Sequence, residues 1–253
     1  MTVALGAAVS YSTGRARAGE GDVILKPLNY LYGADTMGVV YCHGSNRTAI
    51  DTLNRGEPST SDFVQTIATQ YPTIVTDLGG GTTWGNATAQ TRIDEAIAAL
   101  RTATGCNAST FFLAGVSMGG IASFNYARAN PLNVAAIVAA IPVCNLTEIY
   151  TTTADAATGN TVMKNAIATA WGVTAPASLP AGADPYLSPG ELTGVPIRYW
   201  YGDSDPLILP ASAAAFATAT GATASPVVGG HGDSTVGNVP QSDVLAFLAA
   251  YAV

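Results

Sequence analysis

The sequence predicts an α/β fold built on a single doubly wound, mostly parallel β-sheet. Three observations predict this class: short β-rich runs alternate with helical patterns, several of these runs are continuously apolar, and apolar stripes recur at helical spacing. A continuously apolar strand is typical of a sheet that helices cover on both faces. A chain of 253 residues suits one such domain, so we expect residues 1–253 to form a single unit.

Eight segments have the composition of strands. They are residues 3–9, 23–31, 37–42, 73–77, 110–114, 134–141, 196–201 and 225–228. No basic residue precedes the apolar stretch of the first segment, so we interpret that segment as a strand and not as a secretory signal peptide. This interpretation leaves a cytoplasmic location open.

Helices are expected between these strands, each with an apolar stripe that faces the sheet. The stripes consist of Phe63 and Ile67, of Ile93, Ile97 and Leu100, of Ile121 and Phe124, and of Val244, Phe247, Leu248 and Tyr251. Ser61 and Asp62 are the candidate caps of the first helix. The third helix is expected to stop before Asn130, which precedes a proline.

Residues 145–194 break the alternation of strands and helices. They are rich in Thr, Ala, Pro and Gly, lack a clear strand, and hold Trp171 and one helical pattern at residues 162–170. An unstructured loop of this length is improbable inside a compact domain. We therefore expect an insertion folded over the C-terminal edge of the sheet.

The composition excludes several classes of function. Hydrophobic residues make up 48% of the chain and charged residues only 11%, with a net charge of −7. So few basic residues argue against binding to nucleic acid or to an anionic membrane surface. No apolar run reaches the length of about eighteen residues that a membrane span needs. The three cysteines, Cys42, Cys106 and Cys144, match no metal motif and are expected in the core.

Residues 111–120 carry the strongest chemical pattern. They read Phe-Phe-Leu-Ala-Gly-Val-Ser-Met-Gly-Gly and contain Gly-x-Ser-x-Gly centred on Ser117. The pattern follows an apolar strand and opens a helix, which is the context of a nucleophile elbow. Glycines at 115 and 119 permit the tight turn, and the helix N-terminus favours developing negative charge. Ser117 is the predicted nucleophile; the alternative is a tight turn with an incidental serine.

A serine nucleophile needs a general base, and an acid that orients this base. The chain has only two histidines, His43 after an early strand and His231 in a glycine-rich loop after the last strand. The best-placed acids follow the strand at residues 196–201, where Asp203 and Asp205 stand two residues apart. Asp233 is too close in sequence to His231 to orient it easily, and is interpreted as a solvated or helix-capping carboxylate.

The order of these motifs resembles that of the α/β-hydrolase superfamily. His43-Gly44 is similar to its His-Gly motif, residues 202–206 to its Gly-x-x-Asp-Pro signature, and residues 230–232 to its histidine loop. The resemblance covers residues 37–141 and 196–253. It implies a catalytic triad of Ser117, Asp205 and His231, because the last aspartate of the signature is the acid.

The resemblance also implies the oxyanion donors. Met118 should donate one backbone N–H, and Ser45, with Asn46 as the alternative, should donate the second. His43 would hold this loop through hydrogen bonds of its ring. His43, Asn46 and Trp84 are the residues expected near the substrate. The lipase pattern His-Gly-Gly-Gly is absent, which weakens any assignment to hormone-sensitive-lipase-like enzymes.

Residues 77–86 form a glycine-rich loop after a strand. No Gly-Lys-Ser/Thr completes a phosphate-binding loop, and the glycine spacing does not fit a dinucleotide site. We interpret the segment as a loop near the site, in which Trp84 either packs in the core or lines a substrate groove.

These motifs predict a serine hydrolase that cleaves a carboxylic ester without a cofactor or a metal. A peptidase or amidase with the same triad is the nearest alternative. The Ala/Gly/Thr-rich composition is also similar to that of a virion (tail) protein of an actinobacteriophage, which would be a binding module or an envelope esterase. The substrate would accordingly be a small-molecule or envelope-lipid ester, and a virion component would be oligomeric.

Overall fold

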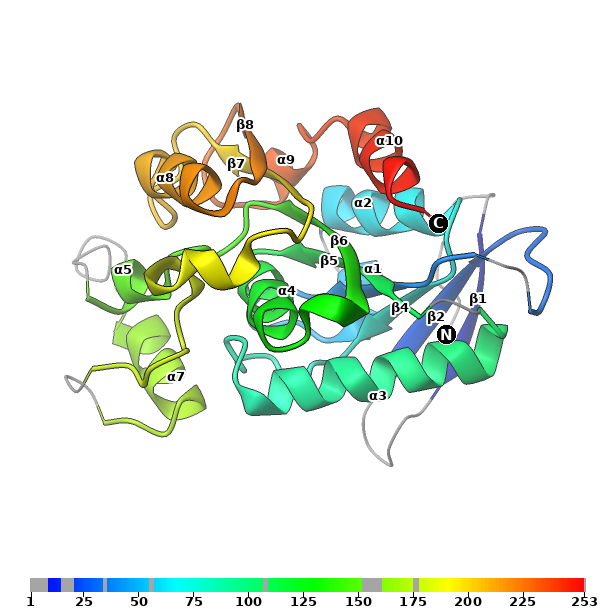
Figure 1. Cartoon of the computed structure of the whole chain (residues 1–253), viewed down its shortest axis with the longest axis horizontal. Coiled ribbons are helices and arrows are strands. Elements are labelled where there is room, and N and C mark those ends of the chain that lie inside the picture. The colour runs from blue at the N-terminus through cyan, green and yellow to red at the C-terminus, as the bar shows by residue number, and fades with distance from the viewer. Residues whose placement is uncertain are drawn as a thin grey trace.

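The computed structural model describes residues 9–14, 21–33, 36–54, 57–106, 109–151, 161–174 and 178–252. One eight-stranded sheet runs through the molecule in the order β1-β2-β4-β3-β5-β6-β7-β8 (Figure 1). β2 pairs antiparallel with β1 and with β4, and every other pairing is parallel. The structure confirms the expected doubly wound, mostly parallel sheet.

The strands lie close to the expected segments. They are β1 (Val9–Gly14), β2 (Asp22–Pro27), β3 (Val39–Cys42), β4 (Thr73–Thr76), β5 (Phe111–Val116), β6 (Val134–Ala140), β7 (Ile197–Gly202) and β8 (Thr223–Val227). Of the expected first strand, residues 3–8 lie outside the described residues, and β1 occupies Val9–Gly14. β2 ends early because a turn follows it, in which the N–H of Tyr30 donates to the carbonyl of Pro27.

Helices cover both faces of the sheet. They are α1 (Ala49–Asn54), α2 (Pro58–Ala68), α3 (Ala87–Thr104), α4 (Met118–Ala129), α5 (Leu146–Thr151), α7 (Thr161–Ala170), α8 (Pro210–Thr220), α9 (Asp233–Val236) and α10 (Gln241–Ala250). The four predicted stripes lie on α2, α3, α4 and α10, except for Tyr251, which follows the end of α10 and is exposed. The predicted caps were wrong, because Pro58 occupies the first turn of α2 and Ser61 and Asp62 lie inside it.

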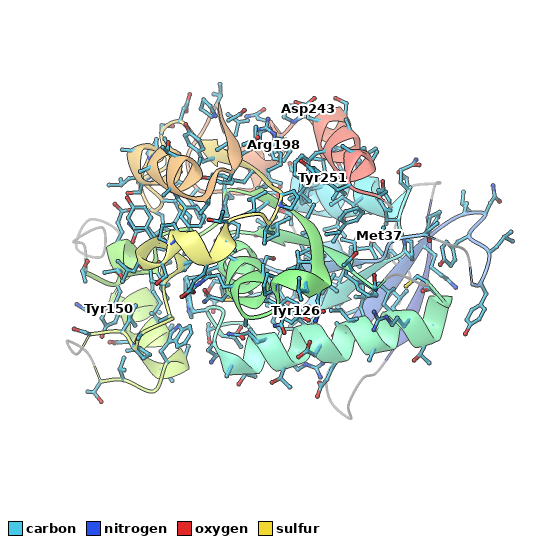
Figure 2. All side chains as sticks on the ribbon, viewed as in Figure 1. Met37, Tyr126, Tyr150, Arg198, Asp243 and Tyr251 are labelled. Carbon is cyan, nitrogen blue, oxygen red and sulfur yellow. The ribbon has the colours of Figure 1, made fainter. Side chains whose placement is uncertain are left out.

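Alternate residues of each strand divide the core into two layers. Val40 and Cys42 of β3 pack in a cluster with α3, α4 and α8, whereas Val39 and Tyr41 pack in a second cluster with α2 and α10. Figure 2 shows side chains filling both layers, with Tyr126 of α4 directed toward α3. Its hydroxyl donates to Asp94 of α3 over 2.6 Å, which joins these two helices.

The segment between β6 and β7 contains α5, α7 and two short 3-10 helices, η2 (Pro185–Leu187) and η3 (Pro189–Leu192). Its expected helix is α7, Thr161–Ala170. Asp184 joins its two ends, because the N–H groups of Thr147 and Tyr186 both donate to the Asp184 carboxylate. The indole of Trp171 donates to the carbonyl of Trp84 over 3.2 Å and so ties α7 to the glycine-rich loop.

All three cysteines are buried as free thiols. Burial raises the pKa of Cys42 to about 12 and also raises the pKa values of Cys106 and Cys144. Among the described residues, no helix is long and apolar enough for a membrane crossing.

Candidate active site

Ser117 lies in a sharp turn between β5, which ends at Val116, and α4, which begins at Met118. Its φ of 53° is unusual for a residue other than glycine. The flanking glycines explain how the chain tolerates this turn. A Cβ atom on Gly119 would lie 1.9 Å from the carbonyl oxygen of Cys42, and one on Gly115 would lie 2.5 Å from the backbone of Gly119. The local sequence therefore dictates the strained position of Ser117.

Three of the predicted site residues form a continuous chain of hydrogen bonds. Oγ of Ser117 lies 2.8 Å from Nε2 of His231, and Nδ1 of His231 lies 2.8 Å from Oδ2 of Asp205. In the tautomer that satisfies both contacts, Nδ1–H donates to Asp205 and Nε2 accepts from the serine hydroxyl. This is the arrangement in which an imidazole can take a proton from serine.

Asp205 is buried, at 2% exposure, and both of its carboxylate oxygens are occupied. Oδ2 accepts from His231, while Oδ1 accepts from the backbone N–H groups of Leu207 and Ile208 over 2.8 and 2.9 Å. These bonds fix the carboxylate plane before any substrate binds. A buried carboxylate held in this way can hold the imidazole in one orientation and stabilise its protonated form.

Asp203 has a different partner, although it stands two residues from Asp205. Its carboxylate accepts from the backbone N–H of Gly229 over 3.0 Å. The N–H of Ser204 also donates to the carbonyl of Gly229 over 3.1 Å. The segment after β7 therefore holds the histidine loop at two levels: Asp205 contacts the ring of His231, and Asp203 and Ser204 contact the backbone that carries this ring.

Asp233 caps a helix and does not contact the ring of His231 among the hydrogen bonds of the described residues. The backbone N–H of Thr60 donates to Oδ1 over 2.7 Å, and that of Ser59 donates to Oδ2 over 3.1 Å. Both donors belong to the first turn of α2, where free N–H groups and the helix dipole favour a carboxylate. The histidine loop is thereby fixed to the N-terminus of α2.

The loop after β3 is fixed to the same helix end. Arg47 forms a hydrogen-bonded ion pair with Glu57, the residue that precedes α2. Arg47 follows Ser45 and Asn46 in the chain, which are the candidate oxyanion residues. The start of α2 therefore holds both the histidine loop, through Asp233, and the loop after β3, through Glu57.

The candidate oxyanion amides differ in their availability. The N–H of Asn46 donates to the carbonyl of Gly81 over 2.6 Å, so it is already engaged. In the described part of the chain, the N–H groups of Ser45 and Met118 have no backbone acceptor outside the regular helix and strand bonds. Ser45 and Met118 are thus the better pair of donors at this site.

His43 has the expected structural role, in which its ring holds the loop through hydrogen bonds, but it is not among the residues that line the cavity. Its side chain is fully buried, with Nδ1 2.7 Å from the carbonyl oxygen of Gly44 and Nε2 3.1 Å from that of Asp77. The ring therefore joins the loop after β3 to the loop after β4. It is a bracing residue beneath the site, because no face of it reaches the cavity.

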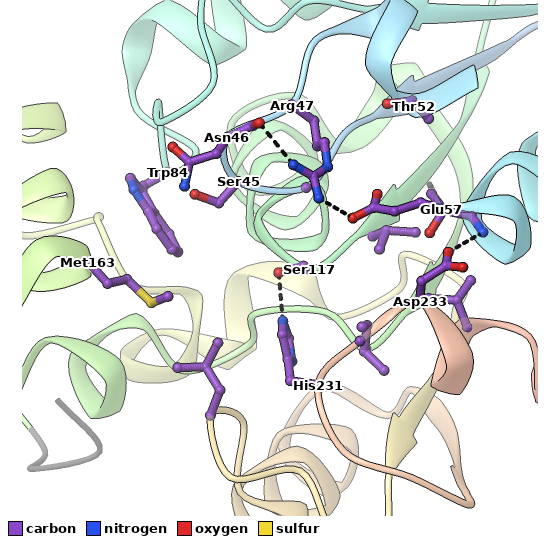
Figure 3. Close-up of a pocket in the computed structure, with 17 residues that line it drawn as sticks. Ser45, Asn46, Arg47, Thr52, Glu57, Trp84, Ser117, Met163, His231 and Asp233 are labelled. Atoms are coloured by element: carbon purple, nitrogen blue, oxygen red, sulfur yellow. Dashed lines mark hydrogen bonds and ion pairs between the residues drawn. The ribbon is translucent and has the colours of Figure 1, made fainter. Parts of the chain in front are cut away.

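A cavity of about 240 Å³ opens beside Ser117 (Figure 3). Its lining includes Ser45, Asn46, Arg47, Glu57, Trp84, Ser117, Met163, Leu207, His231 and Asp233. Trp84 and Met163 lie on one side of Ser117, whereas Arg47, Glu57 and Asp233 lie on the other. Trp84 fills both of its predicted roles, because it lines this cavity and is also packed in the core.

Sequence reasoning missed Arg47, Glu57, Met163 and Leu207. They come from separate parts of the chain, and no motif marks any of them. The sequence holds one signal for Arg47. Charged residues are scarce in this chain, and Arg47 stands three residues after the His-Gly motif, which places a charge close to the site. The roles of the others depend on tertiary contacts alone.

No protein-family model matches the chain, and no curated protein matches its sequence. Solved structures do match. FphF, a fluorophosphonate-binding serine hydrolase of Staphylococcus aureus, superposes with a TM-score of 0.69 over 95% of this chain and 99% of its own, at 14% identity. A brefeldin A esterase, a bacterial homologue of human hormone-sensitive lipase, gives a TM-score of 0.65 over 96% of this chain and 75% of its own, at 17% identity.

The chain has the α/β-hydrolase fold. An acylaminoacyl peptidase of Pyrococcus horikoshii is also similar, with a TM-score of 0.71 over 96% of this chain, at 11% identity. The alignment covers only 42% of that peptidase. At such identities the likeness establishes the α/β-hydrolase fold and leaves the chemistry to be argued from the site.

Proposed function

We propose that the protein is a serine hydrolase that cleaves a carboxylic ester through an acyl-enzyme on Ser117. The observation that carries this proposal is the chain of hydrogen bonds from Ser117 through His231 to Asp205, at 2.8 Å for each contact with the imidazole. The nucleophile of this chain borders a cavity. A reacting carbonyl therefore has both a nucleophile and space beside it.

The proposed reaction has two balanced halves. Oγ of Ser117 attacks the ester carbonyl while Nε2 of His231 takes the hydroxyl proton. The N–H groups of Ser45 and Met118 stabilise the oxyanion. The imidazolium, stabilised by Asp205, then gives its proton to the departing alkoxide and leaves the acyl-enzyme. Water attacks this ester while His231 takes its proton, the bond between the acyl carbon and Oγ breaks, and the imidazolium returns the proton to Oγ, which releases the carboxylic acid and regenerates Ser117.

An ester is preferred over an amide as substrate because the match extends over 75% of the brefeldin A esterase. The acylaminoacyl peptidase keeps amide cleavage as the second candidate, but this chain spans only 42% of it. Hydrolysis rates of an ester and an amide that share one acyl group distinguish the two candidates. We expect the ester to have the higher kcat/KM.

Residues 145–194 are proposed to roof the site as an insertion within the single domain. Support comes from Met163 of α7, which lines the cavity, and from the hydrogen bond between Trp171 and Trp84. On this proposal, shortening the segment changes the acyl-length profile more than it changes the turnover of the smallest ester.

The principal test replaces the nucleophile. Ser117→Ala should lower kcat on short p-nitrophenyl esters by about 10⁶-fold, as removal of a triad serine does elsewhere. Ser109→Ala is the matched control, because Ser109 is exposed and precedes β5 at the opposite end of that strand from Ser117. Wild-type turnover by a folded Ser117→Ala variant would overturn the proposal.

A fluorophosphonate probe separates catalysis from the alternative of a virion binding module. A catalytic serine should be labelled in the wild type and in Ser109→Ala, but not in Ser117→Ala. A protein that uses the fold only for binding should remain unlabelled in all three. The structures named above are enzymes and lend the virion alternative no support.

A further inference from the structure

The cavity beside Ser117 has large apolar side chains on one side and charged side chains on the other. Trp84 and Met163 lie on the first side, with Ser45 and Asn46 at its edge, and Arg47 and Glu57 lie on the second (Figure 3). The side chains of Arg47 and Glu57 remain 38% and 25% exposed, so solute in the cavity can reach both. A substrate that spans the cavity therefore meets an apolar surface at one end and hydrogen-bonding groups at the other.

The size of the cavity limits the substrate. Its volume of about 240 Å³ lies below the range of about 300–1,000 Å³ that is typical of sites for drug-sized ligands. A long acyl chain cannot be contained on the apolar side alone. Its extension past Ser117 would bury methylene groups against Arg47 and Glu57, which removes water from charged groups without replacing its hydrogen bonds. The cavity thus favours a short ester.

The charges of the polar side already have partners. Arg47 is hydrogen-bonded to Glu57, and the carboxylate of Asp233 is held by the N–H groups of Ser59 and Thr60. A substrate carboxylate that took Arg47 would leave Glu57 unpaired, and a substrate ammonium that took Glu57 would leave Arg47 unpaired. Either exchange leaves one partly buried charge without a partner, which costs free energy. A hydroxyl group avoids this penalty, because it can donate to Glu57 and accept from Arg47 while the pair stays intact.

We propose that the substrate is a short ester with an apolar group on one side and a neutral, hydroxyl-bearing group on the other, and that the Arg47–Glu57 pair binds those hydroxyls. This inference rests on the proposed function, since it names the substrate class of the same site. It assigns Arg47 and Glu57 as residues that determine specificity.

The test compares esters of equal size. Acetate esters of glycerol, 1-pentanol, lactate and choline offer neutral polar, apolar, anionic and cationic alcohols, with release of acetic acid followed by pH-stat. A second pair, the methyl esters of 2,3-dihydroxypropanoate and pentanoate, puts the hydroxyls on the acyl side. We expect kcat/KM for the hydroxylated member to exceed that of its apolar match about tenfold or more in one of the two series, since hydrogen bonds to charged groups are strong.

Substitution of the pair should change the preference in a predictable direction. Glu57→Gln leaves Arg47 without its carboxylate partner. The kcat/KM for the lactate ester should therefore rise at least about fivefold relative to that for the glycerol ester. Arg47→Met leaves Glu57 unpaired and should favour the choline ester in the same way. Asp62→Asn is the matched control, because Asp62 is an exposed carboxylate of α2 that does not line the cavity, and its ratios should match the wild type.

The outcomes separate this inference from the proposed function. Equal turnover of hydroxylated and apolar esters, or ratios that Glu57→Gln and Arg47→Met leave unchanged, overturns the assignment of the pair while Ser117 remains the nucleophile. Preference for a charged ester in the wild type also overturns it. Failure of the proposed function shows itself otherwise, as hydrolysis of every ester by Ser117→Ala.

Discussion

The proposed reacting groups and the cavity walls are built in different ways. Ser117, His231 and Asp205 lie at strand ends or in adjoining loops, and backbone amides or glycine contacts fix two of them directly. The walls instead consist of side chains such as Arg47, Glu57 and Met163, which come from separate loops and helices. Ser117 and Asp205 are thus positioned largely by their neighbours in the chain, whereas the loop of His231 and the walls depend on tertiary contacts.

This difference teaches where each property of the site can be changed. Substitution among the proposed reacting groups should abolish turnover, because each takes part directly in the hydrogen-bond chain. Substitution in the walls should change the substrate preference and keep the hydrogen bonds among Ser117, His231 and Asp205 intact. Four experiments test this division, in order of decreasing effect.

The largest effect is expected from the two aspartates after β7. Asp205→Asn should lower kcat by about 10⁴-fold, because the amide no longer stabilises the imidazolium or its productive tautomer. Asp203→Asn should cost less than about tenfold, since its carboxylate contacts only the backbone N–H of Gly229. Steady-state kinetics on one short ester measures both. Equal losses in the two variants would contradict the separate roles of these residues.

The next effect concerns the turn at Ser117. Gly119→Ala would place a methyl group 1.9 Å from the carbonyl oxygen of Cys42, so α4 or β3 must shift. We expect the free energy of unfolding to fall by about 3 kcal/mol or more, as for other overpacked sites. Urea denaturation measures this loss. Gly190→Ala is the control, because no atom lies within 4 Å of its added Cβ, and it should change stability little.

A smaller effect is expected at Asp233. Asp233→Ala removes the carboxylate that accepts from Ser59 and Thr60, which should cost about 0.5–2 kcal/mol of stability, as the loss of a helix cap does. The turnover should also fall, because the loop of His231 loses its attachment to α2. Asp243→Ala provides the comparison: Asp243 lies exposed in the first turn of α10, away from the cavity lining. Identical stability and turnover in the two variants would show that the cap is not needed.

The smallest effect concerns the thiols. Burial raises the pKa of Cys42 to about 12, so this group is protonated at neutral pH, and the other two cysteines are also buried. Iodoacetamide should therefore leave the activity of the folded enzyme unchanged, because the thiolate is the reactive species. Mass spectrometry should find alkylated cysteines only after unfolding. Rapid inactivation of the native protein would point to a thiol near the reaction.

The sequence predicted most of the sheet, because continuous apolar runs such as residues 134–141 have no other favourable place in a fold of this class. It did not predict α8, since the alanine-rich residues 211–215 have no apolar stripe to mark a face. The cap of α2 was misplaced for a related reason: its carboxylate is Asp233, which is distant in sequence and adjacent only after folding.

The site residues also separate into those that local sequence predicts and those that depend on tertiary packing. Ser117 could be predicted because a strand, two glycines and a helix surround it in the sequence, and His231 because the chain has so few histidines. The bracing role of the His43 ring followed from the His-Gly resemblance, but its absence from the cavity lining and its contact with the carbonyl of Asp77 did not. Side-chain direction after a strand depends on the packing of neighbouring loops, which sequence spacing does not encode.

The attachment of two loops to the first turn of α2 has a consequence for thermal inactivation. Fraying of that turn releases the loop of His231, through Asp233, and the loop of Ser45, through Glu57 and Arg47, in the same event. The proposed base and one of the two proposed oxyanion donors, the N–H of Ser45, would then be lost together. Heating should therefore produce a single inactivation step whose midpoint follows the docking of α2, with no intermediate that retains one half of the catalytic apparatus.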